Sequence, residues 1–159
     1  YGVNAGLPKT LMCHAVSYIA DEYEKSGNKN VSDILCDVLA TPVSPELLPP
    51  KDGEIAECTE GIVGPYELHD FFLYHMLRNG YNPAKIYYIA QQSFEGKFDN
   101  ATIKKWLTTF CRRFFAQQFK RSCMPDGPKV GSCSLSPRGD WKMPTDACST
   151  LWLEECETL

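Results

Sequence analysis

The chain has 159 residues, of which 43% are hydrophobic, and a formal net charge of −4. This length allows about one domain with a core of its own, and no apolar run approaches the roughly 20 residues of a membrane-spanning helix. The charge is uneven, because residues 111–142 carry seven Lys or Arg and two Asp, which leaves −9 on the remaining chain. A concentrated basic segment in an acidic protein indicates a local anion site and argues against a nucleic-acid-binding domain.

The first residue is Tyr1, and no signal-peptide pattern follows it. We therefore expect a piece of a longer protein.

The sequence pattern is mostly helical, and no segment has the alternation of a strand. Prolines that suit a first helical turn and glycines that suit a helix end mark the boundaries. A proline-rich connection over residues 41–54 interrupts the pattern. From apolar residues at three- and four-residue spacing, we predict helices over 8–26, 31–40, 66–79, 83–95, 100–119 and 145–157.

A long segment without helical or strand periodicity covers residues 119–146. It holds five Lys or Arg against three Asp, together with four prolines and three glycines. A loop of this length is uncommon in a compact domain and is usually functional or disordered. Because it contains Phe119, Leu135 and Trp141, we favour an ordered loop. A cationic loop shaped by glycine and proline suits a polyphosphate or carboxylate ligand.

The eight cysteines contain no CxxC pair and no spacing typical of a small disulfide framework or a zinc site. We therefore expect reduced thiols in a cytoplasmic protein. His69 and His75 are six residues apart, so they do not share a helical face as a metal-binding pair would. We interpret these two residues and His14 as structural.

Three segments stand out together: residues 4–9 (NAGLPK) at a helix start, residues 43–48 (VSPELL), and the blocks FKRS, MPDGPKVG and LSPRGDW in the loop. With VGPYELHDFFLYH, this combination resembles the C-terminal part of the synthetase domain of glutamine-dependent NAD(+) synthetases. It is most similar to the large bacterial type, which has an N-terminal glutaminase domain. The resemblance covers nearly the whole chain, and the FKRS and SPRGDW blocks are its most specific parts.

The resemblance implies that residues 1–159 are a mainly α segment, the helical C-terminal portion of an α/β, Rossmann-like synthetase domain of the adenine-nucleotide alpha-hydrolase type. It also implies an ATP-dependent ligase. Such enzymes activate the nicotinate carboxylate of deamido-NAD⁺ with ATP and Mg²⁺, form an adenylate, release pyrophosphate and admit ammonia from glutamine to give NAD⁺. This chemistry needs positive charge near the developing pyrophosphate and a pocket that excludes water.

The SGGxDS-type ATP loop and the glutaminase domain of such enzymes are not found in these 159 residues. None of the cysteines is therefore assigned as the glutaminase nucleophile. We expect this part of the chain to hold one wall of the active site and to be inactive alone.

The resemblance places ATP and metal contacts in the first two segments. Lys9 matches a lysine that contacts ATP phosphates, and its place at a helix start independently favours anion binding; a solvated lysine is the alternative. Ser44 takes the place of a threonine that contacts ATP and helps to hold Mg²⁺, or it closes a turn before Pro45. Glu46 is a metal-side carboxylate or an exposed loop acid.

The resemblance places deamido-NAD⁺ contacts in the basic loop. Lys120 matches the lysine that contacts this substrate, but Phe119 precedes it where many single-domain relatives have His, so no imidazole role transfers. Arg121, Arg138 and Asp140 belong to the same signature. Arg138 can bind a phosphate or carboxylate through two N–H groups, and Asp140 can accept from a ribose hydroxyl. Alternatively, Arg138 and Asp140 pair with each other and fix the loop.

Two further alternatives stay open. Trp141 either stacks on a ligand ring or, as we favour, anchors the loop in the core. The chain as a whole is either part of the ligase or a helical oligomerisation module without activity, in which the aromatic helices predicted over 66–79 and 100–119 supply the subunit contacts.

Overall fold

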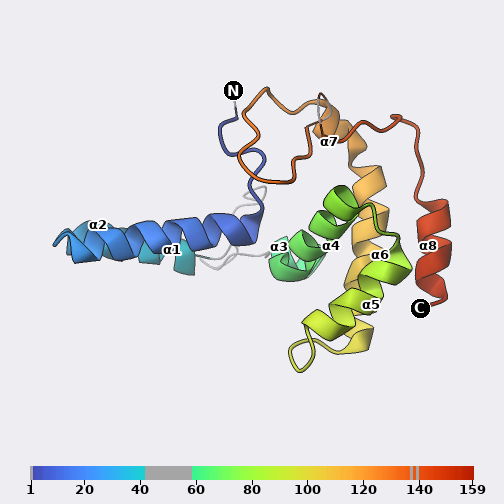
Figure 1. Cartoon of the computed structure of the whole chain (residues 1–159), viewed down its shortest axis with the longest axis horizontal. Coiled ribbons are helices and arrows are strands. Elements are labelled where there is room, and N and C mark those ends of the chain that lie inside the picture. The colour runs from blue at the N-terminus through green and yellow to red at the C-terminus, as the bar shows by residue number, and fades with distance from the viewer. Residues whose placement is uncertain (1, 42–58, 137, 139) are drawn as a thin grey trace, which may run out of the picture. The chain divides into compact units, whose positions relative to one another are not determined.

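The computed structural model describes residues 2–41, 59–136, 138 and 140–159 (Figure 1). In these residues the chain is mainly helical and contains no strand, which confirms the predicted mainly α class. None of the helices in these ranges is long and apolar enough to cross a membrane. The helices are α1 (Lys9–Lys25), α2 (Lys29–Ala40), α3 (Thr59–Val63), α4 (Tyr66–Asn79), α5 (Pro83–Ser93), α6 (Asn100–Ala116), α7 (Gln118–Ser122) and α8 (Thr150–Glu157).

The chain divides into two compact units. The larger unit contains the residues up to Leu7 together with Glu67–Leu159, and the hairpin unit contains Pro8–Tyr66. The hairpin unit is therefore inserted, in sequence, between two segments of the larger unit.

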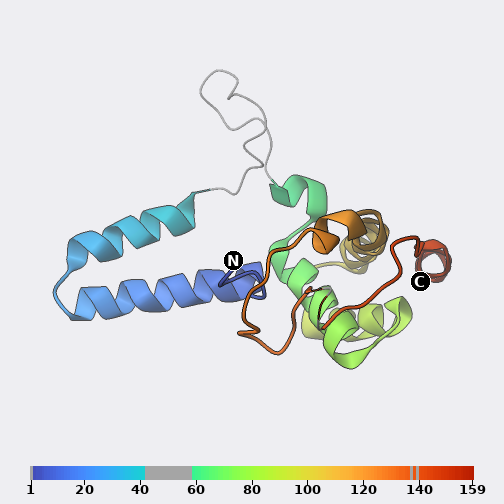
Figure 2. The same cartoon turned by 90° about the horizontal axis from the view of Figure 1, so that it is seen from above.

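The hairpin unit is built on α1 and α2, which lie side by side and antiparallel (Figure 2). Gly27 lies in the turn between them with a φ of 83°, a left-handed conformation that suits glycine. Ala20 and Ser32 are the buried residues of the two helices. Ile34 and Val38 of α2 are 56% and 61% exposed. The hairpin unit thus has a small core and leaves apolar side chains exposed.

The core of the larger unit lies among α4, α5 and α6, with α8 against α5 and α6. Leu68, Phe72 and Met76 follow one another at four-residue spacing on α4 and are almost fully buried. The rings of Phe72 and Phe110 meet at a centroid distance of 5.8 Å. Burial of each such side chain stabilises the fold by about 1.5–3 kcal/mol. The other buried members are Ile86, Ala90, Phe94, Ile103, Leu107, Cys111, Phe114 and Cys156.

Local sequence signals account for the helix boundaries of this unit. The Asn82 side chain accepts a hydrogen bond from the first turn of α5, and Asp99 Oδ1 accepts one from the Thr102 N–H at 2.6 Å at the start of α6. Gly80 and Gly96 follow α4 and α5 with φ values of 65° and 79°. These are the left-handed positions at which a helix commonly ends.

The structure differs from the predicted elements at three places. The helix predicted over 100–119 is divided, because Gln117, with φ −97° and ψ 16°, separates α6 from α7. The helix predicted over 145–157 begins only at Thr150, after residues 144–147 have formed a turn with a hydrogen bond from Ala147 N to Pro144 O. The short helix α3 was not predicted. Most of the proline-rich connection, residues 42–58, lies outside the described residues.

Helix α8 is attached to α5 and α6 by polar contacts near the N-terminal ends of these two helices. Glu155 Oε1 accepts from the Ala84 N–H at 3.1 Å, at the N-terminus of α5, where a negative charge is favourable. Lys104 Nζ of α6 donates to the Leu159 carbonyl at 2.7 Å and to the Glu157 carbonyl at 3.2 Å. Nearer the start of α8, the rings of Trp152 and Phe115 meet edge to face, with centroids 5.0 Å apart.

Candidate functional site

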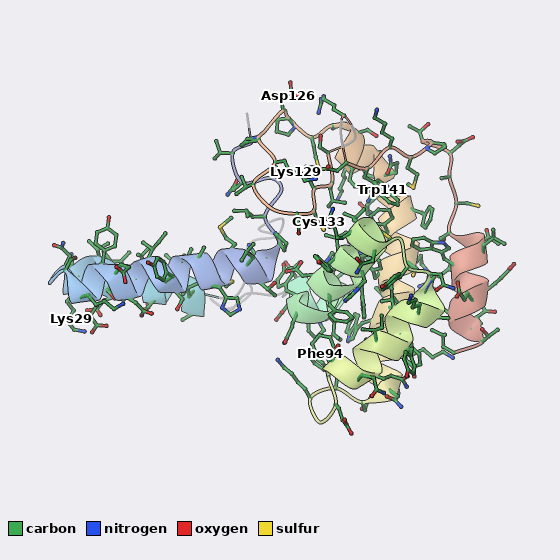
Figure 3. The ribbon with its side chains drawn as sticks, viewed as in Figure 1. Lys29, Phe94, Asp126, Lys129, Cys133 and Trp141 are labelled. Carbon is green, nitrogen blue, oxygen red and sulfur yellow. The ribbon has the colours of Figure 1, made fainter. Side chains whose placement is uncertain are left out.

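The basic loop, residues 119–146, is anchored to the core by Trp141. Its ring meets Phe114 of α6 at a centroid distance of 5.4 Å and an interplanar angle of 80°, an edge-to-face geometry typical of favourable aromatic pairs. The backbone N–H of Trp141 also donates to the Ser136 carbonyl at 3.1 Å, inside the loop, whereas its buried indole nitrogen has no hydrogen-bond partner among the described residues. Figure 3 shows Trp141 beside the core helices, whereas Asp126 lies at the outer edge of the loop. Of the two interpretations of Trp141, the structure supports the loop anchor.

The N-terminal segment of the larger unit, residues 2–7, contacts the same loop. The Gly2 N–H donates to the Asp126 carbonyl at 2.8 Å. A Cβ added to Gly127 would lie 2.1 Å from the Gly2 carbonyl oxygen, so this approach of two backbones requires glycine. Sequence reasoning did not assign Gly127, although the Pro-Asp-Gly sequence at 125–127 is a recognisable turn signal.

Two ion pairs join distant parts of the loop. Arg138 Nε lies 3.0 Å from Asp126 Oδ1, and Arg138 Nη1 donates to the Met124 carbonyl at 2.8 Å. Lys129 Nζ donates to Asp140 Oδ1 at 2.7 Å. The alternative in which Arg138 and Asp140 pair with each other is therefore wrong. Arg138 pairs with Asp126, 12 positions earlier, and Asp140 pairs with Lys129, 11 positions earlier. Figure 3 labels Asp126 and Lys129 on this part of the loop.

Arg121 is buried, with 8% of its surface exposed. Its Nε donates to Gln118 Oε1 at 3.1 Å, and Nη2 donates to the Phe114 carbonyl at the end of α6. The guanidinium carbon lies 3.9 Å from the centroid of the Phe114 ring, which is cation–π geometry. Burial lowers the pKa of this guanidinium below its usual value. The side chain fixes the junction of α6 and α7, and a contact between Arg121 and a ligand stays a prediction.

Phe114 therefore has Arg121 over its ring and Trp141 at its edge. We call Arg121, Phe114 and Trp141 the loop anchor. Because Arg121 comes directly after Lys120 and Trp141 comes near the end of the loop, the loop anchor fixes the segment at two points about 20 residues apart.

Lys120 comes directly before the buried Arg121 on α7. Its side chain is exposed on α7, and among the described residues no hydrogen bond or ion pair engages its ammonium group. Phe119, before it, is 62% exposed. A contact between Lys120 and a ligand stays a prediction.

The remaining predicted site residues lie elsewhere. Lys9 is exposed and is the first residue of α1, in the hairpin unit. Ser44 and Glu46 lie outside the described residues. Within the described ranges, no group of three or more His, Cys, Asp or Glu is placed to hold a metal ion.

The histidines of α4 make ring contacts within the larger unit, as expected for structural residues. His69 meets Phe110 edge to face at 5.3 Å. His75 lies 4.4 Å from Phe71 and is stacked with Tyr81 at 5.7 Å. Burial lowers the pKa of His75, so the neutral imidazole is favoured.

Comparison with curated proteins identifies the relatives of this chain. The "Glutamine-dependent NAD(+) synthetase" of Mycobacterium leprae is 37% identical over 99% of the chain. The proteins of the same name from Mycobacterium bovis and from Mycobacterium tuberculosis H37Rv are each 38% identical over 99% of the chain. The chain is a homologue of glutamine-dependent NAD(+) synthetases. It spans about a quarter of the length of these synthetases, with 25% of each covered.

The resemblance to glutamine-dependent NAD(+) synthetases, predicted from the loop blocks and the N-terminal segment, is thereby confirmed. No family model matches the chain.

Proposed function

We propose that the chain is part of an ATP-dependent amide ligase that converts deamido-NAD⁺ to NAD⁺. In this reaction the nicotinate carboxylate attacks ATP, which gives an acyl adenylate and pyrophosphate. Ammonia derived from glutamine then displaces AMP and forms the amide. The observation that carries the proposal is the match to glutamine-dependent NAD(+) synthetases over 99% of the chain. The chain holds part of the site, and we expect it to be inactive alone and to act within a cytoplasmic enzyme.

Lys120 is the residue that we assign first to deamido-NAD⁺. Its exposed, unpaired ammonium suits the substrate's pyrophosphate or carboxylate, because an ammonium that has no internal partner loses no existing ion pair on binding. The buried side chain of Arg121 helps to position Lys120, since its hydrogen bonds to Gln118 and to the Phe114 carbonyl fix α7, the helix that carries Lys120.

Arg138 and Asp140 contribute to the same ligand in a different way. Each is already held by an ion pair, with Asp126 and Lys129 respectively. Because the carboxylate of Asp126 is 75% exposed, Arg138 can exchange this partner for a phosphate at small desolvation cost. Asp140 retains acceptor capacity beyond its bond to Lys129, which suits a ribose hydroxyl.

ATP and Mg²⁺ are assigned to residues 4–9 and 43–48. Lys9, at the start of α1, is proposed to contact ATP phosphates. Ser44 and Glu46 are the proposed Mg²⁺ contacts, and their hydroxyl and carboxylate oxygens are the donor types that this ion prefers. Mg²⁺ would neutralise phosphate charge when bound.

A binding and activity experiment on the protein that contains this chain tests the assignment. Lys120→Ala is expected to weaken calorimetric binding of deamido-NAD⁺ by at least about tenfold, as for loss of one charge-assisted contact, and to lower NAD⁺ formation while glutamine hydrolysis continues. Arg112→Ala removes an equal charge from the exposed surface of α6 and should change neither. Unchanged NAD⁺ formation in Lys120→Ala would remove Lys120 from the site.

Lys9→Ala separates the two ligands. The apparent requirement for ATP should rise more than that for deamido-NAD⁺, since the lysine is assigned to ATP phosphates. The reverse order would show that Lys9 belongs to the other ligand.

The hairpin unit favours a second candidate function, a helical oligomerisation module. Tyr18 of α1 is 64% exposed, and Ile34 and Val38 of α2 present more apolar surface, as expected for a face that another protein covers. Measurement of the solution mass with and without ligand distinguishes the candidates. A stable oligomer that binds neither deamido-NAD⁺ nor ATP favours the module.

A further inference from the structure

Two thiols from separate helices meet in the core of the larger unit. Cys111 of α6 and Cys156 of α8 are 1% and 0% exposed, and their sulfur atoms lie 3.9 Å apart. A disulfide joins sulfurs about 2.05 Å apart, so an approach of roughly 2 Å separates this pair from a covalent bond. The other thiols in the described residues, apart from the half-buried Cys133, are exposed.

The position of the pair in the chain gives it a consequence that an arbitrary buried pair would lack. Cys111 precedes the basic loop and Cys156 follows it, so a bond between them would enclose the entire segment 119–146. The same two helices carry the aromatic contact between Phe115 and Trp152. A covalent link would therefore reinforce the interface between α6 and α8, the two helices that flank the basic loop in sequence.

Access to the buried pair requires helix α8 to separate briefly from the core. This helix has eight residues, and its polar attachments to Lys104 and to the start of α5 are at or near the surface. Short elements near the end of a compact unit open at lower free energy than its central helices. Opening exposes Cys156, and closing returns it to Cys111.

We propose that Cys111 and Cys156 are a reversible dithiol–disulfide switch that closes the basic loop covalently when the protein meets a peroxide. In the first step, the Cys156 thiolate attacks one oxygen of hydrogen peroxide, which forms a sulfenic acid and releases hydroxide. In the second, the Cys111 sulfur attacks the sulfenic sulfur, the S–S bond forms, and the hydroxyl leaves as water with the Cys111 proton. In total, two thiols lose two hydrogens and one peroxide becomes two waters.

The position of the pair assigns the order of these steps, because Cys156 is on the short helix α8, which separates from the core, whereas Cys111 is on the central helix α6. A hydrogen bond with Cys111 lowers the pKa of Cys156, and a hydrogen bond from Thr108 acts in the same direction. The hydrogen bond with Cys156, followed by burial, raises the pKa of Cys111. Both directions agree with Cys156 as the attacking thiolate and Cys111 as the resolving thiol, because the thiolate is the reactive form.

Peptide mapping of the protein after treatment with hydrogen peroxide tests the switch. Trypsin releases Cys111 in the peptide 106–112, and Cys156 in the peptide that begins at Met143 and also contains Cys148. The experiment is therefore done on Cys148→Ser as well as on the unaltered protein. We expect the two peptides to be found joined, with two hydrogens lost, in both proteins, and to separate after dithiothreitol.

Two further readouts connect the bond to the loop. The cross-link should raise the Tm of the protein by about 5–10 °C, because it restricts the unfolded chain over a loop of this length, and trypsin should cut more slowly after Lys129 and Arg138. Cys156→Ala should show neither effect upon oxidation, whatever its own Tm.

Three results would overturn the switch. The first is a link that forms in denaturant and not in the folded protein. The second is peroxide consumed by exposed thiols such as Cys13 and Cys36 while the pair stays reduced. The third is a joined peptide that disappears in Cys148→Ser, which would assign the bond to Cys148. Since none of these readouts depends on NAD⁺ formation, the proposed function and the switch fail independently.

Discussion

Replacing Trp141 with alanine should release the basic loop without unfolding the helices. Truncation of a fully buried Trp or Phe to Ala costs about 3–5 kcal/mol. Trp141 is half-buried and keeps one edge-to-face contact, with Phe114, a geometry worth about 0.5–1.5 kcal/mol beyond burial. We therefore expect the loop to lose about 2 kcal/mol of local stability, which is a factor of about 30 in its opening equilibrium.

Limited proteolysis with trypsin measures this opening. The loop contains sites at Lys129, Arg138 and Lys142, and the rate of cleavage follows the population of the open form when opening and closing are fast. Cleavage at these sites should accelerate by about 30-fold in Trp141→Ala, and by much less in Trp141→Phe, which keeps an aromatic edge.

Trp106→Ala provides the matched control for a general loss of stability. Trp106 is also a partly buried residue packed against the core, on α6, and the Lys105 ammonium lies over its ring. Trp106→Ala should lower the Tm of the protein without making trypsin cleave the loop selectively. If Trp141→Ala leaves the loop as resistant as before, the loop anchor is not what holds this segment, and our reasoning about it is refuted.

Three other substitutions test separate parts of the structure. Arg121→Met should lower the Tm by several degrees, because it removes buried, charge-assisted hydrogen bonds worth about 1.5–3 kcal/mol each; lost ligand binding with an unchanged Tm would instead make Arg121 a ligand contact. Gly127→Ala should destabilise the loop through a clash with a backbone oxygen and speed hydrogen exchange at the Gly2 amide, whereas Gly61→Ala, which has open space, should not. Burial lowers the pKa of His75, so on acidification the unfolded chain binds this proton before the folded protein does, and stability falls as the pH drops below about 6.5. His75→Phe should reduce this loss of Tm at acid pH. A pH profile of Tm identical to that of the unaltered protein would show that His75 is not the source of the loss.

The helices could be predicted from the sequence because their signals are local. Asp99 and Asn82 act as caps, Gly80 and Gly96 end their helices, and the apolar spacing of α4 and α6 follows the helical period. The break at Gln117 could not be predicted, since nothing in its neighbours opposes a continuous helix. It depends on Arg121 reaching back to the Phe114 carbonyl, a contact made only after the chain has folded.

The candidate site was predictable as a segment and not as a set of contacts. Composition alone identified the basic loop, and the resemblance placed Lys120 within it. The alternative that paired Arg138 with Asp140 was wrong, because both Asp126 and Asp140 are close enough in sequence to pair with Arg138 and only the path of the loop decides between them. The meeting of Cys111 with Cys156 carries no sequence signal at all, since it follows from the packing of α8 on α6.

The contact between Gly2 and Asp126 also sets an order of events during synthesis. Residue 2 leaves the ribosome well before residue 126 has been added, and at about 5–20 residues per second the interval is roughly 6–25 s. During that time the N-terminal segment has no partner in the loop, while the hairpin unit, whose helices are neighbours in sequence, can already form. The larger unit is therefore completed only after the basic loop has emerged, and a ribosome that stalls within this loop leaves residues 2–7 exposed to proteases.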